Sequence, residues 1–399
     1  MISFSEALQL VLKHSVDLGE EKVLLNDSVG RVLAEKIYAD RDFPPFDRAT
    51  KDGIAINYKA IEKGLIDFPI SDIAAAGNPQ KELHNSEYCM EIMTGAVIPK
   101  NADTVIMYEH LSIAQGKVRV KETVKKGQNI HQKGGDEMKG ATLLKDGVLL
   151  SAAEIGVLAS VGKSEVLVKK LPKICVISTG DELVDVNEVP QPHQLRKSNT
   201  YTLKAILQGE KIIANRLHIN DDKEITKKEL LKALKRYDVL LLSGGVSKGK
   251  YDYLPEVFKE IEVKKIFHKI KQRPGKPFWF GNHESSQTTI FAFPGNPVST
   301  FANYHIYFKP WINKSLGLPS VRISVILDET FNNTTDLTRF IQAKVQIASG
   351  KLVVSLIQAN GSGDLTSLSK ANGFVIFAPN TPYKKGEVVQ VIATRRFFK

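Results

Sequence analysis

Apolar and polar positions follow two different periods along the chain, and the changes of period predict its organisation. Near the start, Leu8, Val11 and Leu12 form an apolar stripe at helical spacing, which predicts a helix from Ser5, as its cap, to about His14. Residues from about 50 to 150 instead show short alternating runs such as Val118-Arg-Val-Lys121 between Gly, Asn and Asp turns. That pattern is typical of a β-rich module.

A capping box marks the exit from this module. Ser151-Ala-Ala-Glu154 opens a short helix, which Gly162 closes. From Lys173 onward, apolar strands alternate with amphipathic helices, which is the pattern of βαβ units. We expect strands at 174–177, 239–242 and 288–293, and helices at 199–209, 222–235, 253–261 and after Pro297. They predict an open, mostly parallel sheet with ligands at the carboxyl ends of its strands.

After Leu318 no helical period is evident, and strands are expected at 322–327, 340–347, 352–357, 374–377 and 388–392. The predicted fold is therefore multidomain α/β plus β, with β-rich N-terminal modules, a central α/β domain and a small C-terminal β-barrel. The expected domains are 1–49 with 137–170 (a linker and helical domain), 50–136 (β-rich), 171–318 (α/β) and 319–399 (barrel).

Composition narrows the class of protein. The 399 residues are 42% hydrophobic and 25% charged, with no run that approaches a membrane span, which excludes a membrane protein and a disordered chain. The N-terminus lacks the features of a signal peptide, and Cys89 and Cys175 cannot build a disulfide framework, so we expect a cytoplasmic protein. The net charge of +11 favours an anionic partner. Because the basic residues are spread thinly, a small phosphorylated ligand is a better interpretation than nucleic acid.

The strongest local signal is the glycine-rich turn Leu242-Ser-Gly-Gly-Val-Ser-Lys-Gly-Lys-Tyr-Asp-Tyr253, between a buried strand and a helix. Glycines let backbone N–H groups converge on an anion, and a helix N-terminus adds partial positive charge. The turn therefore predicts phosphate binding at Ser243, Gly244, Gly245 and Ser247, ahead of the alternative of a tight turn without a ligand. Tyr251 stands where the magnesium-binding Ser or Thr of a P-loop belongs, which disfavours a P-loop ATPase.

Three further turns are candidates for chemistry, and the first two lie at the same sheet edge as the glycine turn. Asp181 and Glu182 follow the first strand of the α/β region and either hold a metal ion or cap the next segment. Phe293-Pro-Gly-Asn-Pro-Val-Ser299 is either a ligand-binding or simply a rigid turn. Arg273-Pro-Gly-Lys-Pro277, with Lys269 and Lys271 upstream, suits an anionic substrate, although lysine runs are commonly solvated surface.

Taken together, these segments resemble the MoeA family, the molybdopterin molybdenumtransferases, which includes the E domain of gephyrin. The resemblance runs almost from end to end, through FPPFDRATKDGIA, IMTGAVIPKNADTVIMYE, GGDEMKG, ISTGDEL, LRKSN, SGGVSKGKYDY, RPGKP, FPGNPVS and NGSGDLTSL. It implies that adenylylated molybdopterin and molybdate, the two substrates, give molybdenum cofactor and AMP with the help of Mg²⁺. It also implies an elongated homodimer that shares its active cleft, and it allows contacts with other proteins of molybdenum cofactor synthesis.

The resemblance also assigns site residues. Catalytic positions implied by the family are Asp52, Thr94, Asp136, Glu182 and Asp221. Substrate-binding positions are Lys269, Arg273, Lys276, Pro294, Pro297 and Ser362, beside the glycine turn, and Asp181 and Glu182 are the expected metal ligands. The chain departs from the usual family residues while keeping the acids, at Arg48, Lys51, Ile54, His131, Gly135, Lys248, Lys250 and Arg273.

Two other functions are compatible with parts of the sequence. A molybdopterin adenylyltransferase has a similar α/β domain, but it does not need residues 1–165 or the C-terminal β region. A non-catalytic scaffold that docks a peptide, as the likeness to gephyrin suggests, does not need the retained acids.

Overall fold

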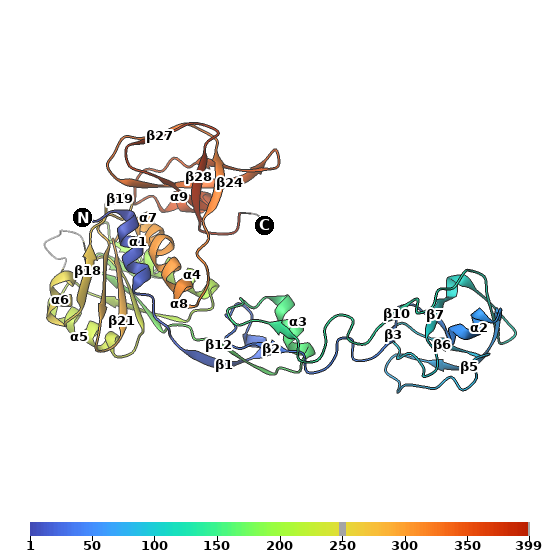
Figure 1. Cartoon of the computed structure of the whole chain (residues 1–399). Coiled ribbons are helices and arrows are strands. Elements are labelled where there is room, and N and C mark those ends of the chain that lie inside the picture. Colours follow the sequence, from blue (N-terminus) through green and yellow to red (C-terminus); the bar gives the residue numbers. More distant parts are fainter. Residues whose placement is uncertain (247–252, 398–399) are drawn as a thin grey trace. The chain divides into compact units, whose positions relative to one another are not determined.

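The computed structural model describes residues 1–246 and 253–397, which form two compact units (Figure 1). Unit 1 comprises residues 1–23, 30–34 and 167–399, and unit 2 comprises residues 24–29 and 35–166. The expected phosphate-binding residue Ser247 and the departures Lys248 and Lys250 lie outside the described residues. None of the helices in 1–246 and 253–397 has the length and apolar character that a membrane span requires.

Unit 2 is built on a six-stranded sheet, as its alternating sequence predicts. The strand order is β7 (Thr104–Met107), β4 (Gly53–Ile56), β6 (Cys89–Ile92), β5 (Asp67–Ala74), β9 (Lys117–Val120) and β8 (Leu111–Ala114). Strand β9 alternates between exposed and buried residues, with Val118 and Val120 in the core. The short helix α2 (Tyr58–Glu62) packs Ala60 into the same core. The expected β-rich module is therefore confirmed for this region.

Unit 2 also contains α3 (Ala152–Ser160), which begins with the predicted capping box of Ser151 and Glu154. Two two-stranded ribbons complete it: β2 (Ile37–Tyr38) with β11 (Thr142–Leu144), and β3 (Arg48–Ala49) with β10 (Ile130–His131). Both ribbons pair residues about a hundred positions apart. The segment that leads into the six-stranded sheet therefore lies beside the segment that leaves it.

The central sheet of unit 1 has the order β16-β13-β17-β21-β20-β18. Its first four strands are parallel: β16 (Ala214–Ile219), β13 (Ile174–Thr179), β17 (Val239–Ser243) and β21 (Thr288–Phe293). Every residue of β13, β17 and β21 is buried, as in a sheet covered on both faces. The prediction of a mostly parallel sheet missed an antiparallel extension, β20 (Trp279–His283) and β18 (Lys264–His268).

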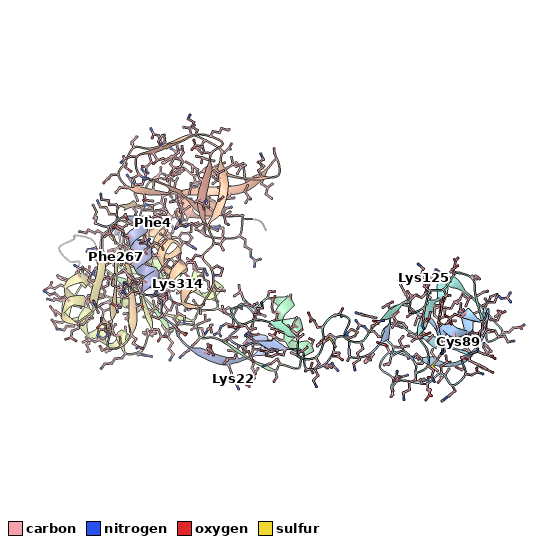
Figure 2. All side chains as sticks on the ribbon, viewed as in Figure 1. Phe4, Lys22, Cys89, Lys125, Phe267 and Lys314 are labelled. Atoms are coloured by element: carbon pink, nitrogen blue, oxygen red, sulfur yellow. The ribbon has the colours of Figure 1, made fainter. Side chains whose placement is uncertain are left out.

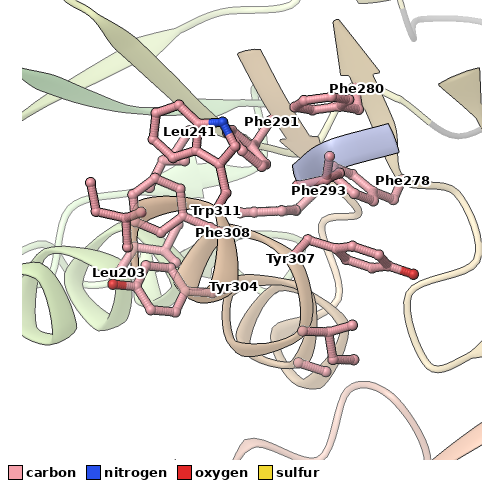
Figure 3. Close-up of a cluster of buried hydrophobic side chains, with 14 of the residues drawn as sticks. Leu203, Leu241, Phe278, Phe280, Phe291, Phe293, Tyr304, Tyr307, Phe308 and Trp311 are labelled. Atoms are coloured by element: carbon pink, nitrogen blue, oxygen red, sulfur yellow. The ribbon is translucent and has the colours of Figure 1, made fainter. Parts of the chain in front are cut away.

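Helices cover both faces of this sheet. Side chains of β13 alternate between two cores: Ile174 and Val176 pack with α1 (Phe4–Lys13) and α4 (Ser198–Gly209), whereas Cys175 and Ile177 pack with α5 (Lys223–Leu234) and α6 (Leu254–Glu260). The first face also holds a dense aromatic cluster, in which Phe291 meets Trp311 edge to face at 5.5 Å (Figure 3). The helix α1 is capped by Ser3 with Glu6, so the expected cap at Ser5 is wrong.

The helix expected after Pro297 is present and contains a π-helical turn. It runs as α7 (Pro297–Asn303), a π-helical turn (Tyr304–Phe308) and α8 (Lys309–Ser315). Pro310 lies two residues after the π turn and has no N–H to donate to the carbonyl of Ile306, four residues before it. The lost hydrogen bond gives a physical reason for a widened turn at this place.

The C-terminal part of unit 1 is a closed barrel, which confirms the prediction. Strands pair in a ring: β24 (Thr338–Ala348), β25 (Lys351–Leu356), β22 (Ile323–Leu327), β28 (Val388–Ala393), β26 (Gly373–Phe377) and β24 again. The expectation of no helix beyond Leu318 is wrong, because Asp364 caps a six-residue helix, α9 (Leu365–Lys370). The short strand β19 (Gln272–Arg273) joins the barrel from the α/β region by pairing with β24.

Candidate active site

The candidate site of unit 1 begins at the point where the strand order of the sheet reverses. The chain passes from β13 to β16 on one side and then crosses to β17 on the other, so a crevice opens at the carboxyl ends of β13 and β17. Gly180 and Gly244 follow these strands with positive φ values of 127° and 106°. A Cβ on Gly244 would lie 2.9 Å from the Thr179 hydroxyl oxygen. Both turns therefore require glycine.

Hydrogen bonds tie two of the predicted loops together through the helix α4. The Asn199 side-chain amide donates to the Ser243 Oγ at 2.8 Å and to the Gly295 carbonyl at 2.6 Å. The Thr300 hydroxyl donates to the Pro294 carbonyl at 2.6 Å. Asn199 belongs to the LRKSN segment, which the sequence did not connect to any loop. The structure makes it the link between the glycine turn and the FPGNPVS turn.

The glycine turn differs in detail from the expected phosphate cradle. The Ser243 side chain is 3% exposed and its hydroxyl is already bonded to Asn199, while the Gly244 amide donates to the Phe293 carbonyl at 3.1 Å. The Ser243 hydroxyl and the Gly244 amide are therefore already bonded within the protein, and phosphate binding at these residues stays a prediction. Gly245 also has a positive φ, of 69°.

The two adjacent acids lie on the neighbouring turn. The Asp181 carboxylate accepts a 3.1 Å hydrogen bond from the Asp221 amide, which brings two of the expected acids together. Glu182 is exposed, and its carboxylate folds back over Gly180. His218 bonds the Ser178 hydroxyl at 3.0 Å; its pKa is lowered mainly by burial, against the opposing effect of Asp181 and Glu182.

The donor set of this turn can be compared with what Mg²⁺ requires. In the described part of the chain, no group of three or more His, Cys, Asp or Glu side chains is arranged to hold a metal. Magnesium commonly binds through one or two carboxylates together with substrate phosphates and water. Asp181 and Glu182 fit that mode.

A cavity of about 430 Å³ opens beside these loops, between the α/β region and the barrel. It is lined by four of the expected binding residues, Arg273, Lys276, Pro294 and Ser362. Asn296 donates to the Ser362 hydroxyl at 2.8 Å, which joins the FPGNPVS turn to the barrel. The predicted residues Lys269 and Pro297 are not among the described residues that line it.

Two further residues of the barrel line this cavity, and the sequence did not identify either. Arg339 lies on β24 directly in register with Arg273. Burial and the neighbouring Arg273 charge lower the pKa of Arg339. Among the described residues, neither the Arg339 Nε nor the Gln342 Oε1 has a hydrogen-bond partner, although both atoms are buried. Only the pairing of β19 with β24 brings these groups to the cavity, so no sequence signal could have found them.

The floor of the cavity is rigid. The Tyr307 hydroxyl donates to the Gln272 side chain, whose amide donates to Asn303 at 2.9 Å. A Cβ on Gly275 would collide with the Asn303 side chain, at 2.3 Å. The RPGKP turn is therefore held in one conformation, with Arg273 and Lys276 displayed from it.

The remaining predicted residues lie in unit 2 and form two separate hydrogen-bonded groups. Thr94 donates to the Asp52 carboxylate through both its amide and its hydroxyl, each at 2.6 Å, and these bonds lower the pKa of Asp52. Asp136 accepts from His131 Nε2 at 3.1 Å, and His131 Nδ1 lies 3.3 Å from an Arg48 nitrogen. The structure therefore gives two of the departures, Arg48 and His131, a common contact with an expected catalytic acid.

The cysteines play no part in either group. Both are free, and burial raises the pKa of each thiol to about 12. Figure 2 shows Cys89 inside unit 2. Since the thiolate is the reactive form, neither residue is suited to act as a nucleophile.

Three family models that belong to molybdopterin biosynthesis match successive regions of the chain. The family model described as "MoeA N-terminal region (domain I and II)" matches residues 2–162, "Probable molybdopterin binding domain" matches 175–314, and "MoeA C-terminal region (domain IV)" matches 324–394. A curated protein of Synechocystis, named molybdopterin molybdenumtransferase, is 38% identical over 379 residues, which cover 94% of this chain and 95% of that protein. A protein of the same name from Staphylococcus epidermidis is 31% identical over 98% of this chain and 96% of its own.

Solved structures agree with the sequence comparisons. A crystal structure of a molybdopterin biosynthesis MoeA protein from Pyrococcus horikoshii superposes with a TM-score of 0.83 at 29% identity, covering 99% of this chain and all of that one. A second structure of that protein gives a TM-score of 0.82 at 30% identity over 98% of this chain. Because sequence, fold and domain order agree over nearly the full length, the chain belongs to the MoeA family.

Proposed function

We propose that the protein is a molybdopterin molybdenumtransferase, which inserts molybdenum from molybdate into adenylylated molybdopterin and releases AMP. The observation that carries the proposal is the cavity of about 430 Å³ with Arg273, Lys276 and Arg339 on its walls. Molybdate is a tetrahedral dianion, and the phosphates of the adenylylated pterin are also anionic, so both substrates require converging cations.

Each group has a defined part in this proposal. Arg273, Lys276 and Arg339 neutralise the oxyanion, and the Ser362 hydroxyl orients it. The glycine turn lets the pyrophosphate approach the sheet closely at Gly244 and Gly245. Asp181 and Glu182 would hold Mg²⁺, which offsets the charge of the phosphates when bound.

The proposal also gives the acids of unit 2 a part. We propose a homodimer in the cytoplasm in which Asp52 and Asp136 act on the substrates bound by unit 1 of the partner subunit. The free, buried cysteines fit a reducing compartment. Light scattering should give twice the chain mass of 44.2 kDa. A mass of one chain in active protein would reject the shared cleft.

The decisive test measures AMP released from adenylylated molybdopterin with molybdate and Mg²⁺. Lys276→Met should reduce AMP release by roughly 10²-fold or more, the scale for loss of one preorganised charged group. Lys271→Met is the matched control, because Lys271 is exposed, its ammonium lies 3.8 Å from Asp336 at the surface, and it is not among the described residues that line the cavity. Absence of AMP release by the unmodified protein would reject the enzyme and favour a scaffold.

A further inference from the structure

The amino ends of the parallel strands in the central sheet bound a second cavity, of about 760 Å³. Its lining includes Ile174 at the start of β13, Ile213 just before β16 and Tyr237 just before β17. The candidate active site lies at the other ends of the same strands. Since the six residues of β13 span roughly 20 Å, the two cavities are separate.

This second cavity is strongly cationic. The described residues that line it include a single carboxylate, Glu21, and six cations: Arg31, Lys170, Lys173, Lys211, Lys235 and Arg236. Glu21 is already paired with Arg31 at 2.6 Å. Within residues 1–246 and 253–397, no carboxylate oxygen lies within 4.0 Å of the ammonium groups of the four lysines. The charges of these four lysines are therefore not neutralised by ion pairs within the described part of the chain.

Arg31 gives the cavity a fixed cation. Its side chain is only 9% exposed, and one terminal nitrogen donates both to Glu21 and to the Lys169 carbonyl, at 2.6 and 2.8 Å. Its Nε, also buried, has no hydrogen-bond partner among the described residues. A buried donor without an acceptor is unfavourable, and an oxyanion at this wall would supply one.

Helix termini account for only part of the cluster. Lysines are common where helices end, because they offset the partial negative charge of the last carbonyls. Lys211 and Lys235 follow α4 and α5 and can be explained in this way. Arg31, Lys170 and Lys173 lie at no helix terminus, so their convergence on the same cavity needs another cause.

One wall of the cavity is apolar. Ile213 is 86% exposed, and the Tyr237 hydroxyl accepts a 2.7 Å hydrogen bond from Asn215, which fixes the position of the Tyr237 ring. An exposed isoleucine and an oriented aromatic ring in the same lining offer contact to an uncharged part of a ligand.

We propose that this cavity is a second anion site, which binds the di- or triphosphate group of a small molecule. Its volume is in the range of small-molecule sites, and several converging cations suit a phosphate chain better than a single carboxylate. Free pyrophosphate and a nucleoside polyphosphate share this chemistry. The inference does not depend on the proposed function, because it concerns a different cavity.

The test is calorimetric titration of the full-length protein with inorganic pyrophosphate, ATP and adenosine. All titrations use the Lys276→Met background, so that binding at the candidate active site is weakened and does not mask the second site. Adding Lys173→Gln and Lys235→Gln should weaken pyrophosphate binding about tenfold or more, the scale for loss of charge-assisted hydrogen bonds. The matched control is Lys228→Gln with Lys259→Gln, which removes the same charge from exposed helix positions outside both cavities.

Comparing the three ligands shows whether the cavity recognises a whole nucleotide or the phosphate chain alone. Tighter binding of ATP than of pyrophosphate, with no binding of adenosine, would support a nucleoside polyphosphate; equal binding of ATP and pyrophosphate would support the phosphate chain alone. Unchanged pyrophosphate binding by the Lys173/Lys235 variant would overturn the site. Binding of a polyglutamate peptide but not of pyrophosphate would also overturn it, in favour of a docking face for an acidic protein.

A separate readout shows whether the two cavities are independent. In the otherwise unmodified protein, Lys173→Gln with Lys235→Gln should leave AMP release and the thermal unfolding midpoint unchanged. Loss of AMP release with an unchanged midpoint would reject a separate site. If the unmodified protein releases no AMP, the proposed function fails while the titrations still decide this inference.

Discussion

The polar groups of the candidate cavity in unit 1 and those of the predicted acids in unit 2 are arranged in opposite ways. In unit 1, the Arg339 Nε and the Gln342 Oε1 are buried without a partner among the described residues. In unit 2, Asp52 already accepts two short hydrogen bonds from Thr94, and Asp136 accepts one from His131.

The difference shows how the structure positions a cation that binds an anion in unit 1 and a carboxylate that must stay ionised in unit 2. The unpartnered Arg339 Nε–H and the neighbouring Arg273 charge make unit 1 less stable locally, but this donor is available to an anion at no further cost of rearrangement. Hydrogen bonds that favour the ionised form keep Asp52 as a carboxylate and fix its direction. We therefore expect substitutions in unit 1 to separate activity from stability, and those in unit 2 to lower activity by a smaller factor.

The largest effect is expected for Arg339→Met. Removing this guanidinium should lower AMP release by roughly 10²- to 10³-fold, since it deletes one preorganised charge. The unfolding midpoint should stay equal or rise, because a partly buried cation beside Arg273 is replaced by an apolar side chain of similar length. Arg322→Met, at an exposed position outside the cavity, is the control. A lower midpoint with normal AMP release would make Arg339 a structural residue and remove the contrast between the units.

His305 tests whether an unsatisfied group outside the cavity matters in the same way. It is buried against Phe301 and Tyr304, its Nε2 has no partner among the described residues, and burial lowers its pKa to about 3. The folded protein keeps this ring neutral while the unfolded chain protonates it below about pH 6.5, so this contribution to stability is lost as the pH falls from about 6.5 toward 3.

His305→Phe should remove that dependence. The free energy of unfolding of the unmodified protein should fall by about 2 kcal/mol more than that of the variant between pH 7 and pH 5. Urea unfolding at both pH values measures the difference, with AMP release at pH 7 as the control for function. Parallel losses of stability in the two proteins would contradict the assignment of His305 as the acid-sensitive group.

A smaller effect is expected for Thr94→Val, which keeps the backbone bond to Asp52 and removes the hydroxyl bond. The pKa of Asp52 should move up toward its ordinary value, because the largest cause of its lowering is lost. AMP release should fall about tenfold through poorer positioning of the carboxylate. An NMR titration of the Asp52 carboxyl checks the pKa, and Thr94→Ser should restore it. No change in either quantity would mean that Asp52 does not depend on Thr94.

The smallest effect is expected at the departure His131. Arginine can only donate hydrogen bonds, so Nδ1 of His131 accepts from Arg48 and Nε2–H donates to Asp136. His131→Leu should reduce AMP release only a few-fold, since all three groups are near the surface and water can replace the lost bond. Arg48→Met tests the same chain from its other end. A hundredfold loss for either variant would show that Asp136 is positioned as strictly as the cations of unit 1.

Local signals in the sequence predicted much of this protein. Capping residues and apolar periods located α3, α4 and α5 to within a residue or two, since these features act over one helical turn. Glycine positions also located the turns at Gly180 and Gly244, because their positive φ values exclude other residues. Family motifs supplied Arg273, Lys276 and Ser362, which the structure brings to one cavity.

Tertiary structure alone decided the contacts between distant segments. The register of β19 on β24 places Arg339 beside Arg273, and the fold brings Arg31 to the same wall as Lys173. The antiparallel strands β18 and β20 were missed for the same reason, because their pairing is set by neighbours rather than by their own residues. Sequence periodicity reports which face of an element is buried, but it carries no information about which distant element will lie against that face.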